Sequence, residues 1–165
     1  MSDERAWIRG ARKGSVADLE RLFREYWPRA YRAAQLVTGD AAAAEDIAQE
    51  AFLAAVRNLD RFDRHRPFAP WLHRIVINRA IDWTRARKLR AEVQLGDYLP
   101  APGPPDPDGT VLGRIGVLTP EQRAVVVLRY VLEYTPGEIA ELLHLPRGTV
   151  NSRLRRGLDS MKDEP

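Results

Sequence analysis

Side chains suited to reading duplex DNA gather near the C-terminal end of the chain. Helical spacing over residues 146–161 turns Val150, Leu154 and Leu158 inward. The outer stripe is polar and is richest near the start of this helix: Arg147, Thr149, Asn151, Ser152, Arg155 and Arg156. Arginine binds guanine, asparagine binds adenine, and hydroxyls hold phosphate, so this pattern predicts a helix laid in the major groove. An ordinary cationic face in solvent is the alternative.

The segments before this helix predict a helix-turn-helix. Residues 119–122 (TPEQ) place a cap, a first-turn proline and a capping-box partner in order, and residues 135–138 (TPGE) repeat the device. The turn at residues 143–148 then joins two short helices. His144 stands where such turns usually carry glycine.

An acidic stripe marks a second amphipathic helix, which we expect to begin after Gly39 and Asp40. Its apolar residues share one face, and its outer face carries Glu45, Asp46, Gln49, Glu50, Leu53 and Arg57. An acidic face does not suit DNA. It is either a protein-docking face or simply solvent-exposed, and composition alone favours simple exposure.

A third helix, expected from about Pro70, interleaves aromatic and basic side chains. Phe68, Trp71 and Trp83 alternate with several arginines, and the helix runs out in the basic stretch at residues 85–90. Aromatic rings and guanidinium groups together hold unpaired bases and phosphates. The alternative is that the rings belong to the core.

Catalytic patterns are missing from the sequence. The histidines His65, His73 and His144 are scattered, and the chain lacks metalloprotease spacing, a glycine-rich phosphate loop and a nucleophile elbow. Asp63 with His65 can be drawn as a metal pair, but we predict no metal site there. We expect no enzyme activity, cofactor or small-molecule substrate.

Apolar residues recur at helical spacing on both sides of one proline-rich stretch, so the predicted fold is all-α with two small helical domains. In the first domain Ser15 is the expected cap of a helix that Pro28 should kink or split. Residues 91–113 hold five prolines, four acids and no base, which predicts a flexible acidic linker without helix. The expected domains are therefore residues 1–90 and 114–165.

Charge and composition limit the class of protein. The 165 residues carry a net charge of +3, of which residues 1–90 contribute +6 and residues 91–113 contribute −4. Cysteine is absent, which excludes disulfides and favours a reducing compartment. The longest aliphatic run, at residues 124–128, is far too short to span a bilayer. We expect a soluble, cytoplasmic protein without membrane insertion.

Three stretches resemble a known family: AEDIAQEAFLAAVRNLDRF at 44–62, FAPWLHRIVINRAIDWTRAR at 68–87, and LTPEQRAVVVLRYVLEYTPGEIAELLHLPRGTVNSRLRRGLDSMK at 118–162. In their order and spacing they are similar to bacterial RNA polymerase sigma factors of the extracytoplasmic-function (ECF) group, within the sigma-70 family. The resemblance covers about residues 15–90 and 118–162. It implies that the first domain is sigma region 2 and the second is sigma region 4.

The resemblance implies a factor that binds core RNA polymerase and directs promoter-specific transcription initiation. We name three sets of residues from it. The docking set, for the polymerase, is Glu45, Asp46, Gln49, Glu50, Leu53 and Arg57. The minus-10 set, for recognising and melting that element, is Asp63, Arg64, His65, Arg66, Trp71, Arg74, Asn78, Arg79 and Arg85. The minus-35 set is Arg147, Thr149, Asn151, Ser152, Arg155 and Arg156.

Regulation also follows from the resemblance. Many ECF sigma factors are held inactive by an anti-sigma factor and serve stress responses, so an anti-sigma factor is an expected partner. The alternative function is an autonomous helix-turn-helix regulator whose N-terminal domain senses a ligand or dimerises. The acidic face and the aromatic, basic helix favour the sigma factor, because a ligand sensor needs neither.

Overall fold

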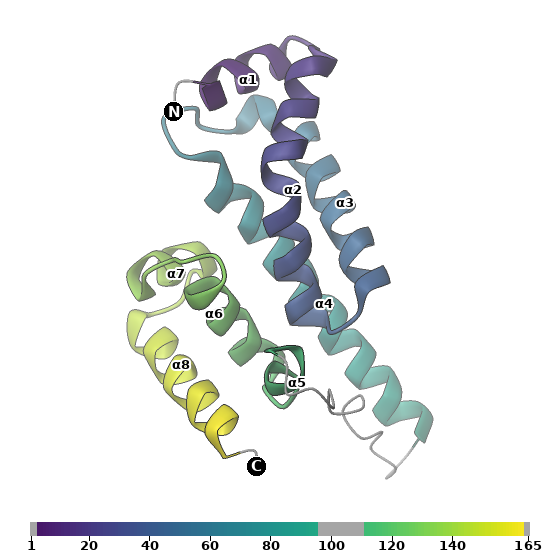
Figure 1. Ribbon diagram of the computed structural model, residues 1–165, viewed down its shortest axis with the longest axis vertical. Coiled ribbons are helices and arrows are strands. Elements are labelled where there is room, and N and C mark those ends of the chain that lie inside the picture. Colours follow the sequence, from purple (N-terminus) through teal and green to yellow (C-terminus); the bar gives the residue numbers. More distant parts are fainter. Residues whose placement is uncertain (1–2, 96–110, 164–165) are drawn as a thin grey trace.

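The computed structural model describes residues 3–95 and 111–163, and within these ranges it is helical with no strand (Figure 1). The N-terminal half contains α1 (Asp3–Arg12), α2 (Val16–Thr38), α3 (Ala41–Arg57), the 3₁₀ turn η1 (Leu59–Arg61) and α4 (Phe68–Leu95). The C-terminal half contains α5 (Val111–Gly116), α6 (Pro120–Tyr130), α7 (Pro136–Leu143) and α8 (Arg147–Lys162). The all-α prediction is confirmed. No described helix is long and apolar enough to cross a membrane.

Helices α2, α3 and α4 pack side by side, and α1 lies across the end of α2 (Figure 1). Much of their shared core is alanine: Ala33 and Ala34 of α2 and Ala48 and Ala51 of α3 are fully buried. Because the distance between packed helices depends on the side chains at the contact, small residues let these helices approach closely. The polar side chains of α3 are consequently turned outward.

The helix boundaries follow local signals in the sequence. The side chains of Ser15, Asp40 and Thr119 each accept a hydrogen bond from the backbone N–H three residues on, at 3.2, 2.9 and 3.2 Å. These caps confirm the expected starts of α2, α3 and α6. Gly39 ends α2 with a φ of 70°, a left-handed conformation that glycine adopts without strain.

Pro28 does not split α2, which runs unbroken from Val16 to Thr38. Proline removes one hydrogen bond from the helix ladder. Leu22 and Ala30, on either side of it, are buried against the neighbouring helices. We attribute the continuity of α2 to this packing, which stabilises most helices in proteins more than local propensity does.

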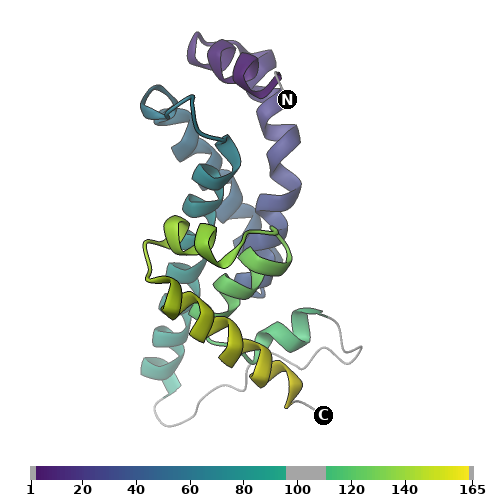
Figure 2. The ribbon, with the colours of Figure 1, turned by 90° about the vertical axis from the view of Figure 1, so that its left-hand side faces the viewer.

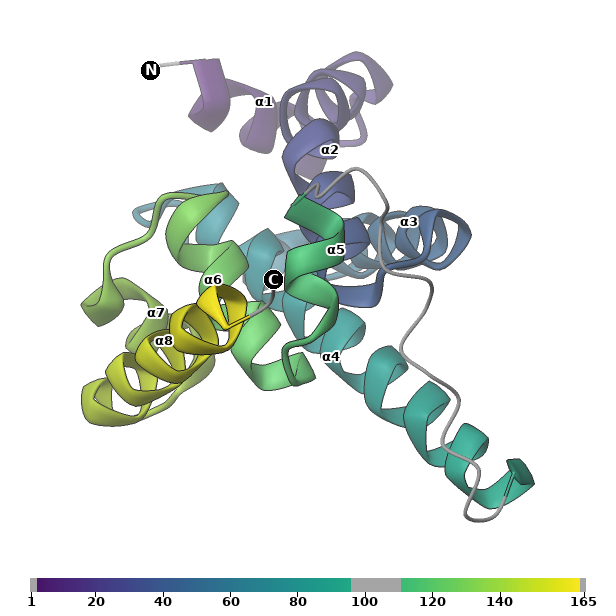
Figure 3. The same ribbon diagram turned by 60° about the horizontal axis from the view of Figure 1, so that its bottom comes forward.

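The predicted linker boundaries are wrong at both ends. Residues 91–95 continue α4, and residues 111–113 belong to α5, although residues 91–113 were expected to contain no helix. The stretch AEVQL that completes α4 contains neither glycine nor proline, and the first proline comes only at Pro100. The rest of the expected linker lies outside the described residues. The C-terminal end of α4 extends beyond the packed helices (Figure 3).

The two halves pack against each other: α6 lies against α2 and α4, and α7 lies against α4 (Figure 2). Arg123 of α6 reaches across to the C-terminal end of α2, where Nη1 donates to the Val37 carbonyl at 3.0 Å. Arg85 of α4 donates from Nε to Glu121 of α6 at 2.6 Å. The two halves are thus joined by polar contacts as well as by apolar packing.

Candidate functional site

The minus-35 set lies on the outer side of α8. Val150, Leu154 and Gly157 are buried against the rest of the C-terminal half, and α8 packs along α6 (Figure 2). A Cβ atom built on Gly157 would lie 3.3 Å from a methyl group of Val126, which shows how close the two helices are. Four members of the set are exposed: Arg147, Asn151, Arg155 and Arg156. The other two, Thr149 and Ser152, are half-buried.

The turn before α8 gives this helix its direction. His144 ends α7 with φ 53° and ψ 47°, the left-handed conformation that favours glycine. The Leu145 N–H donates to the Ala140 carbonyl at 3.0 Å and closes the turn. Helix α8 then starts at Arg147 after Pro146, without a side-chain cap. The Thr149 N–H donates to the Pro146 carbonyl at 3.0 Å, so it is the N–H groups of Arg147 and Gly148 that suit a phosphate.

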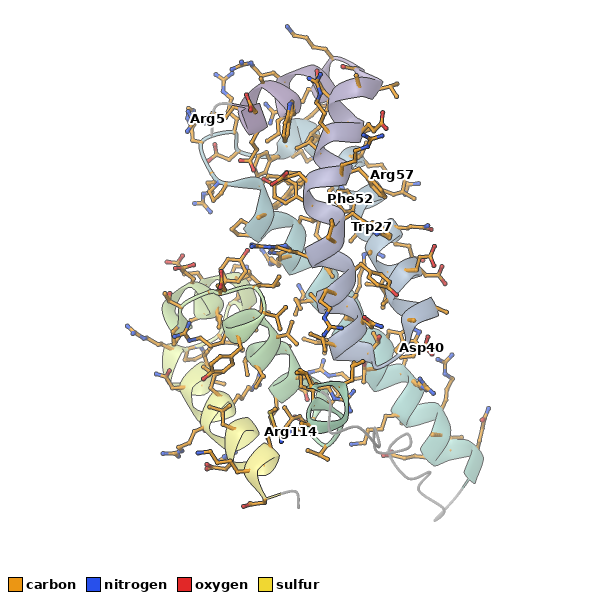
Figure 4. All side chains as sticks on the ribbon, viewed as in Figure 1. Arg5, Trp27, Asp40, Phe52, Arg57 and Arg114 are labelled. Carbon is orange, nitrogen blue, oxygen red and sulfur yellow. The ribbon has the colours of Figure 1, made fainter. Side chains whose placement is uncertain are left out.

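All members of the docking set are exposed on the outer face of α3: Glu45, Asp46, Gln49, Glu50, Leu53 and Arg57. The opposite face, which includes Ile47 and Ala51, is buried against α2 and α4. Figure 4 shows Arg57 at the end of α3, with Phe52, five residues earlier, beside Trp27 of α2. The packing of α3 therefore presents the acidic stripe to solvent.

An apolar groove of about 290 Å³ accompanies this stripe. Its lining comes from α2 and α3: Leu19, Phe23, Gln49, Phe52, Leu53 and Val56. Phe23, Leu53 and Val56 are 40%, 54% and 38% exposed. Phe23 and Val56 lie on the apolar faces of their helices at helical spacing, yet both remain exposed, because no helix covers that edge between α2 and α3 in the described residues. A wide apolar stripe was the only sequence signal for the groove.

The minus-10 set divides between a loop and α4. The loop residues Asp63, Arg64, His65 and Arg66 are all exposed. An Asp63 carboxylate oxygen accepts the His65 N–H at 2.9 Å, and the Asp63 carbonyl accepts the Arg66 N–H at 3.0 Å. These bonds give the loop a defined turn whose side chains point to solvent.

On α4 the remaining members of the set differ in their surroundings. Arg74, Asn78 and Arg79 are exposed, whereas Trp71 is half-buried, with its ring centroid 4.8 Å from that of Phe62. Arg79 forms an ion pair with Glu50 of the docking set, with Nη1 and Oε2 3.2 Å apart. Trp71 is therefore at the rim of the core, which leaves part of its ring accessible.

Arg85, the last member of the set, turns toward the C-terminal half. Burial raises the pKa of Glu121, but hydrogen bonds from its own backbone and from Arg85, with the charges of Arg85 and Arg153, outweigh this and lower it overall. The carboxylate is thus held ionised beside Arg85. In this arrangement Arg85 contributes to the contact between the halves, a role that sequence reasoning missed.

Trp83 of α4 is half-buried. The Arg87 guanidinium lies over its ring, 5.3 Å from the ring centroid.

Two family descriptions match this chain and together cover most of it. Residues 22–90 match Sigma-70 region 2, and residues 110–161 match Sigma-70, region 4. A match to region 2 over the N-terminal half does not favour the alternative of a ligand-sensing domain there.

Related proteins extend the match over nearly the whole chain. The ECF RNA polymerase sigma factor SigW of Bacillus subtilis is 33% identical over 175 residues, covering 95% of this chain and 94% of SigW. The ECF RNA polymerase sigma factor SigL of Mycobacterium tuberculosis is 31% identical over 166 residues, with 95% and 94% covered.

Solved structures share the fold. CnrH, in complex with the cytosolic domain of CnrY, has a TM-score of 0.73 and 26% identity, covering 97% of this chain and 95% of CnrH. The sigma factor RpoE of Bartonella quintana, in complex with the anti-sigma factor NepR, has a TM-score of 0.72 over 90% of this chain and 96% of RpoE; at 19% identity this likeness concerns the fold alone. From the family matches and the relatives together, the chain belongs to the sigma-70 family, as a sigma factor of the ECF group.

Proposed function

We propose that this protein binds core RNA polymerase and directs it to promoters through two DNA-reading surfaces. The docking set on α3 holds the polymerase, the minus-10 set captures and melts the downstream element, and the minus-35 set on α8 reads the upstream element. The protein supplies binding energy and no catalytic step, and it acts in the cytoplasm. Its domains are a region 2 domain ending with α4 and a region 4 domain containing α6, α7 and α8.

The groove between α2 and α3 carries this proposal. It joins exposed apolar side chains, Leu53 and Val56, to the carboxylates of Asp46 and Glu50 on the same helix. Carboxylates repel the phosphates of DNA, whereas an apolar patch with a polar rim is typical of a protein interface. The surface therefore fits a protein partner with apolar and basic side chains, which is the role of the polymerase in the family.

The two DNA-reading surfaces differ in the state of DNA that they suit. The outer stripe of α8 presents a row of arginine and asparagine side chains on a rigid helix, which fits base edges in the major groove of a duplex. The loop at residues 63–66 and the rim of Trp71 combine charge with an aromatic ring, which fits an unpaired base. This difference supports promoter recognition at one element and melting at the other.

An anti-sigma factor is the regulator that we propose. The solved neighbours CnrH and RpoE are described in complexes, the latter with an anti-sigma factor. The exposed groove on α3 offers such a partner an apolar surface, and a partner seated there would exclude the polymerase.

Run-off transcription with purified core polymerase tests the proposal. Addition of the protein should produce promoter-specific transcripts from genomic templates, and core polymerase alone should not. The double variant D46K/E50K should lose core binding while its helical content, measured by circular dichroism, is retained. The matched control is D159K/D163K, which makes the same charge change at the same spacing near the C-terminal end of α8 and should bind core normally. Equal core affinity for both double variants contradicts the proposed docking face.

A further inference from the structure

Arg12, the last residue of α1, reaches a part of the chain that is distant in sequence. Its Nε donates to the Leu59 carbonyl at 2.9 Å, and its Nη2 donates to the Phe62 carbonyl. Leu59 is the first residue of the 3₁₀ turn η1, and Phe62 is the residue that follows this turn. Phe62 also directly precedes the loop at residues 63–66. Arg12 therefore holds the chain at the point where it enters the loop of the minus-10 set.

The geometry of the guanidinium explains why an arginine suits this position. A planar fork with several N–H donors can bond two carbonyls at once and so fix the orientation of both peptide planes. Hydrogen bonds from a charged donor are about twice as strong as neutral ones. The Leu59 carbonyl also accepts the Phe62 N–H at 3.2 Å, so Arg12 braces a turn that is already closed.

Both ends of the loop are anchored. Phe62 and Phe68 are 5% and 2% exposed, and their ring centroids lie 5.7 Å apart. Between them, the four loop side chains are exposed, and the Asp63 carboxylate organises the turn through the His65 N–H. A loop with fixed ends and exposed tips is suited to hold one shape before its ligand arrives.

Helix α1 is itself held in place by packing, so Arg12 can position the loop from it. Ile8 is 1% exposed and belongs to the core, and α1 packs against both α2 and η1. In Figures 1 and 2, α1 lies at the same end of the molecule as the loop before α4. The family match to region 2 begins only at residue 22, so this support lies outside the matched segment.

We propose that Arg12 is a positioning residue for promoter melting: it fixes the entry to the loop at residues 63–66 so that the loop captures one unpaired base of the minus-10 element. This inference rests on the proposed function of the loop. Arg12 need not touch DNA; it determines where Asp63, Arg64 and His65 are presented. Without the Arg12 contacts the loop has to become ordered as the correct base binds. This cost lowers the affinity for the correct base and so reduces the discrimination against the other bases.

The test uses holoenzyme assembled from core polymerase and the full chain. Its probe is a single-stranded oligonucleotide carrying the non-template minus-10 sequence of a promoter that the wild-type holoenzyme transcribes, with each position replaced in turn by the other three bases. The variants are Arg12→Gln and Arg12→Lys, with Arg9→Gln as the matched control. Arg9 is exposed in the same last turn of α1, so the control removes the same charge from the same helix.

For Arg12→Gln we expect discrimination at one position to fall about tenfold, while core binding stays close to that of Arg9→Gln. The thermal midpoint of Arg12→Gln should fall, because two carbonyls lose their charged donor, so the oligonucleotides are compared at a temperature well below the midpoints of all variants. Arg12→Lys, which keeps the charge without the fork, should recover part of the discrimination. Full discrimination by Arg12→Gln, or an equal loss of affinity for every oligonucleotide, overturns the inference and leaves the proposed function intact. Absence of discrimination at every position in the wild-type holoenzyme overturns the proposed role of the minus-10 set, on which this inference rests.

Discussion

His73 Nδ1 lies 2.7 Å from the hydroxyl oxygen of Tyr134, and this contact joins α4 to the segment between α6 and α7. The two side chains are only 2% and 9% exposed. His73 Nε2 has no hydrogen-bond partner among residues 3–95 and 111–163. Burial, together with the positive charge of Arg29 on α2, lowers the pKa of His73 from 6.5 to about 4. The contact between the two halves is thus built around a neutral imidazole.

Stability should therefore fall in mild acid. Because the folded-state pKa of His73 lies below its unfolded value, the unfolded chain binds the proton more tightly. The contribution of neutral His73 to the free energy of unfolding is fully present above about pH 6.5. It declines as the pH drops toward 4, where the loss of unfolding free energy reaches about 3 kcal/mol. Other groups face this contact too: burial and the charge of Glu138 on α7 raise the pKa of Tyr134, so its hydroxyl stays protonated. Urea denaturation at a series of pH values measures the decline.

Two histidine variants separate this effect from general acid sensitivity. His73→Gln should flatten the dependence of unfolding free energy on pH between about 7 and 4.5, whatever its stability at neutral pH. His65→Gln, which removes an exposed histidine from the loop before α4, should retain the wild-type slope. Identical slopes for the two variants would show that His73 does not titrate as its burial requires.

Arg123 gives a second prediction about the contact between the halves. Its guanidinium donates to three carbonyls, those of Val37, Gly116 and Leu118, at 3.0, 2.8 and 3.0 Å. Methionine replaces the aliphatic part of the arginine side chain but has no donor, so Arg123→Met leaves these carbonyls without their charged partner. We expect a loss of about 3 kcal/mol in unfolding free energy, measured by urea denaturation.

The control for Arg123 is Arg114→Met. Arg114 is an exposed residue of α5, and Figure 4 shows it away from the N-terminal half. Its replacement should change the unfolding free energy by no more than about 0.5 kcal/mol. A comparable loss in both variants would mean that general charge, rather than the three carbonyl contacts, accounts for the effect of Arg123.

Which features were predictable from the sequence depends on how far apart the interacting residues are. The caps at Ser15, Asp40 and Thr119 act on the residue three positions later, so a short segment contains the whole signal. The all-α class, the helix-turn-helix and the exposed stripes on α3 and α8 follow equally from local periodicity. The roles of the docking, minus-10 and minus-35 residues came from the family resemblance and remain predictions.

Long-range contacts were not predictable in this way. Arg12 and Leu59 are 47 residues apart, and Arg123 and Val37 are 86 apart, so no local pattern connects them. Helix α1 was missed for a related reason, because it is held by its contacts with α2 and η1. The end of α4 was missed because the prolines from Pro100 onward dominated the composition of a segment whose first five residues favour a helix.

Leu53 provides a test of the groove that is independent of charge. Because its side chain is 54% exposed, Leu53→Ala should change the unfolding free energy little, yet weaken core polymerase binding by about 1 to 2 kcal/mol if the side chain is buried in the complex. Leu89→Ala is the matched control, since Leu89 on the extended end of α4 is 62% exposed. Titration of fluorescently labelled protein with core polymerase measures both. An unchanged affinity for Leu53→Ala contradicts a buried role for the groove.

Arg156 tests how α8 reads the minus-35 element. It is exposed on the outer side of the helix, opposite the buried Leu154 and Gly157 side that packs on α6. If its guanidinium contacts one guanine with two hydrogen bonds, Arg156→Ala should cost about 1 to 3 kcal/mol on the preferred sequence and almost nothing once that base pair is replaced. Arg156→Lys should recover only part of this preference, because an ammonium can donate to guanine but lacks the planar fork. Holoenzyme binding to a minus-35 library gives the answer; an equal loss on every sequence, restored by lysine, would instead identify a phosphate contact.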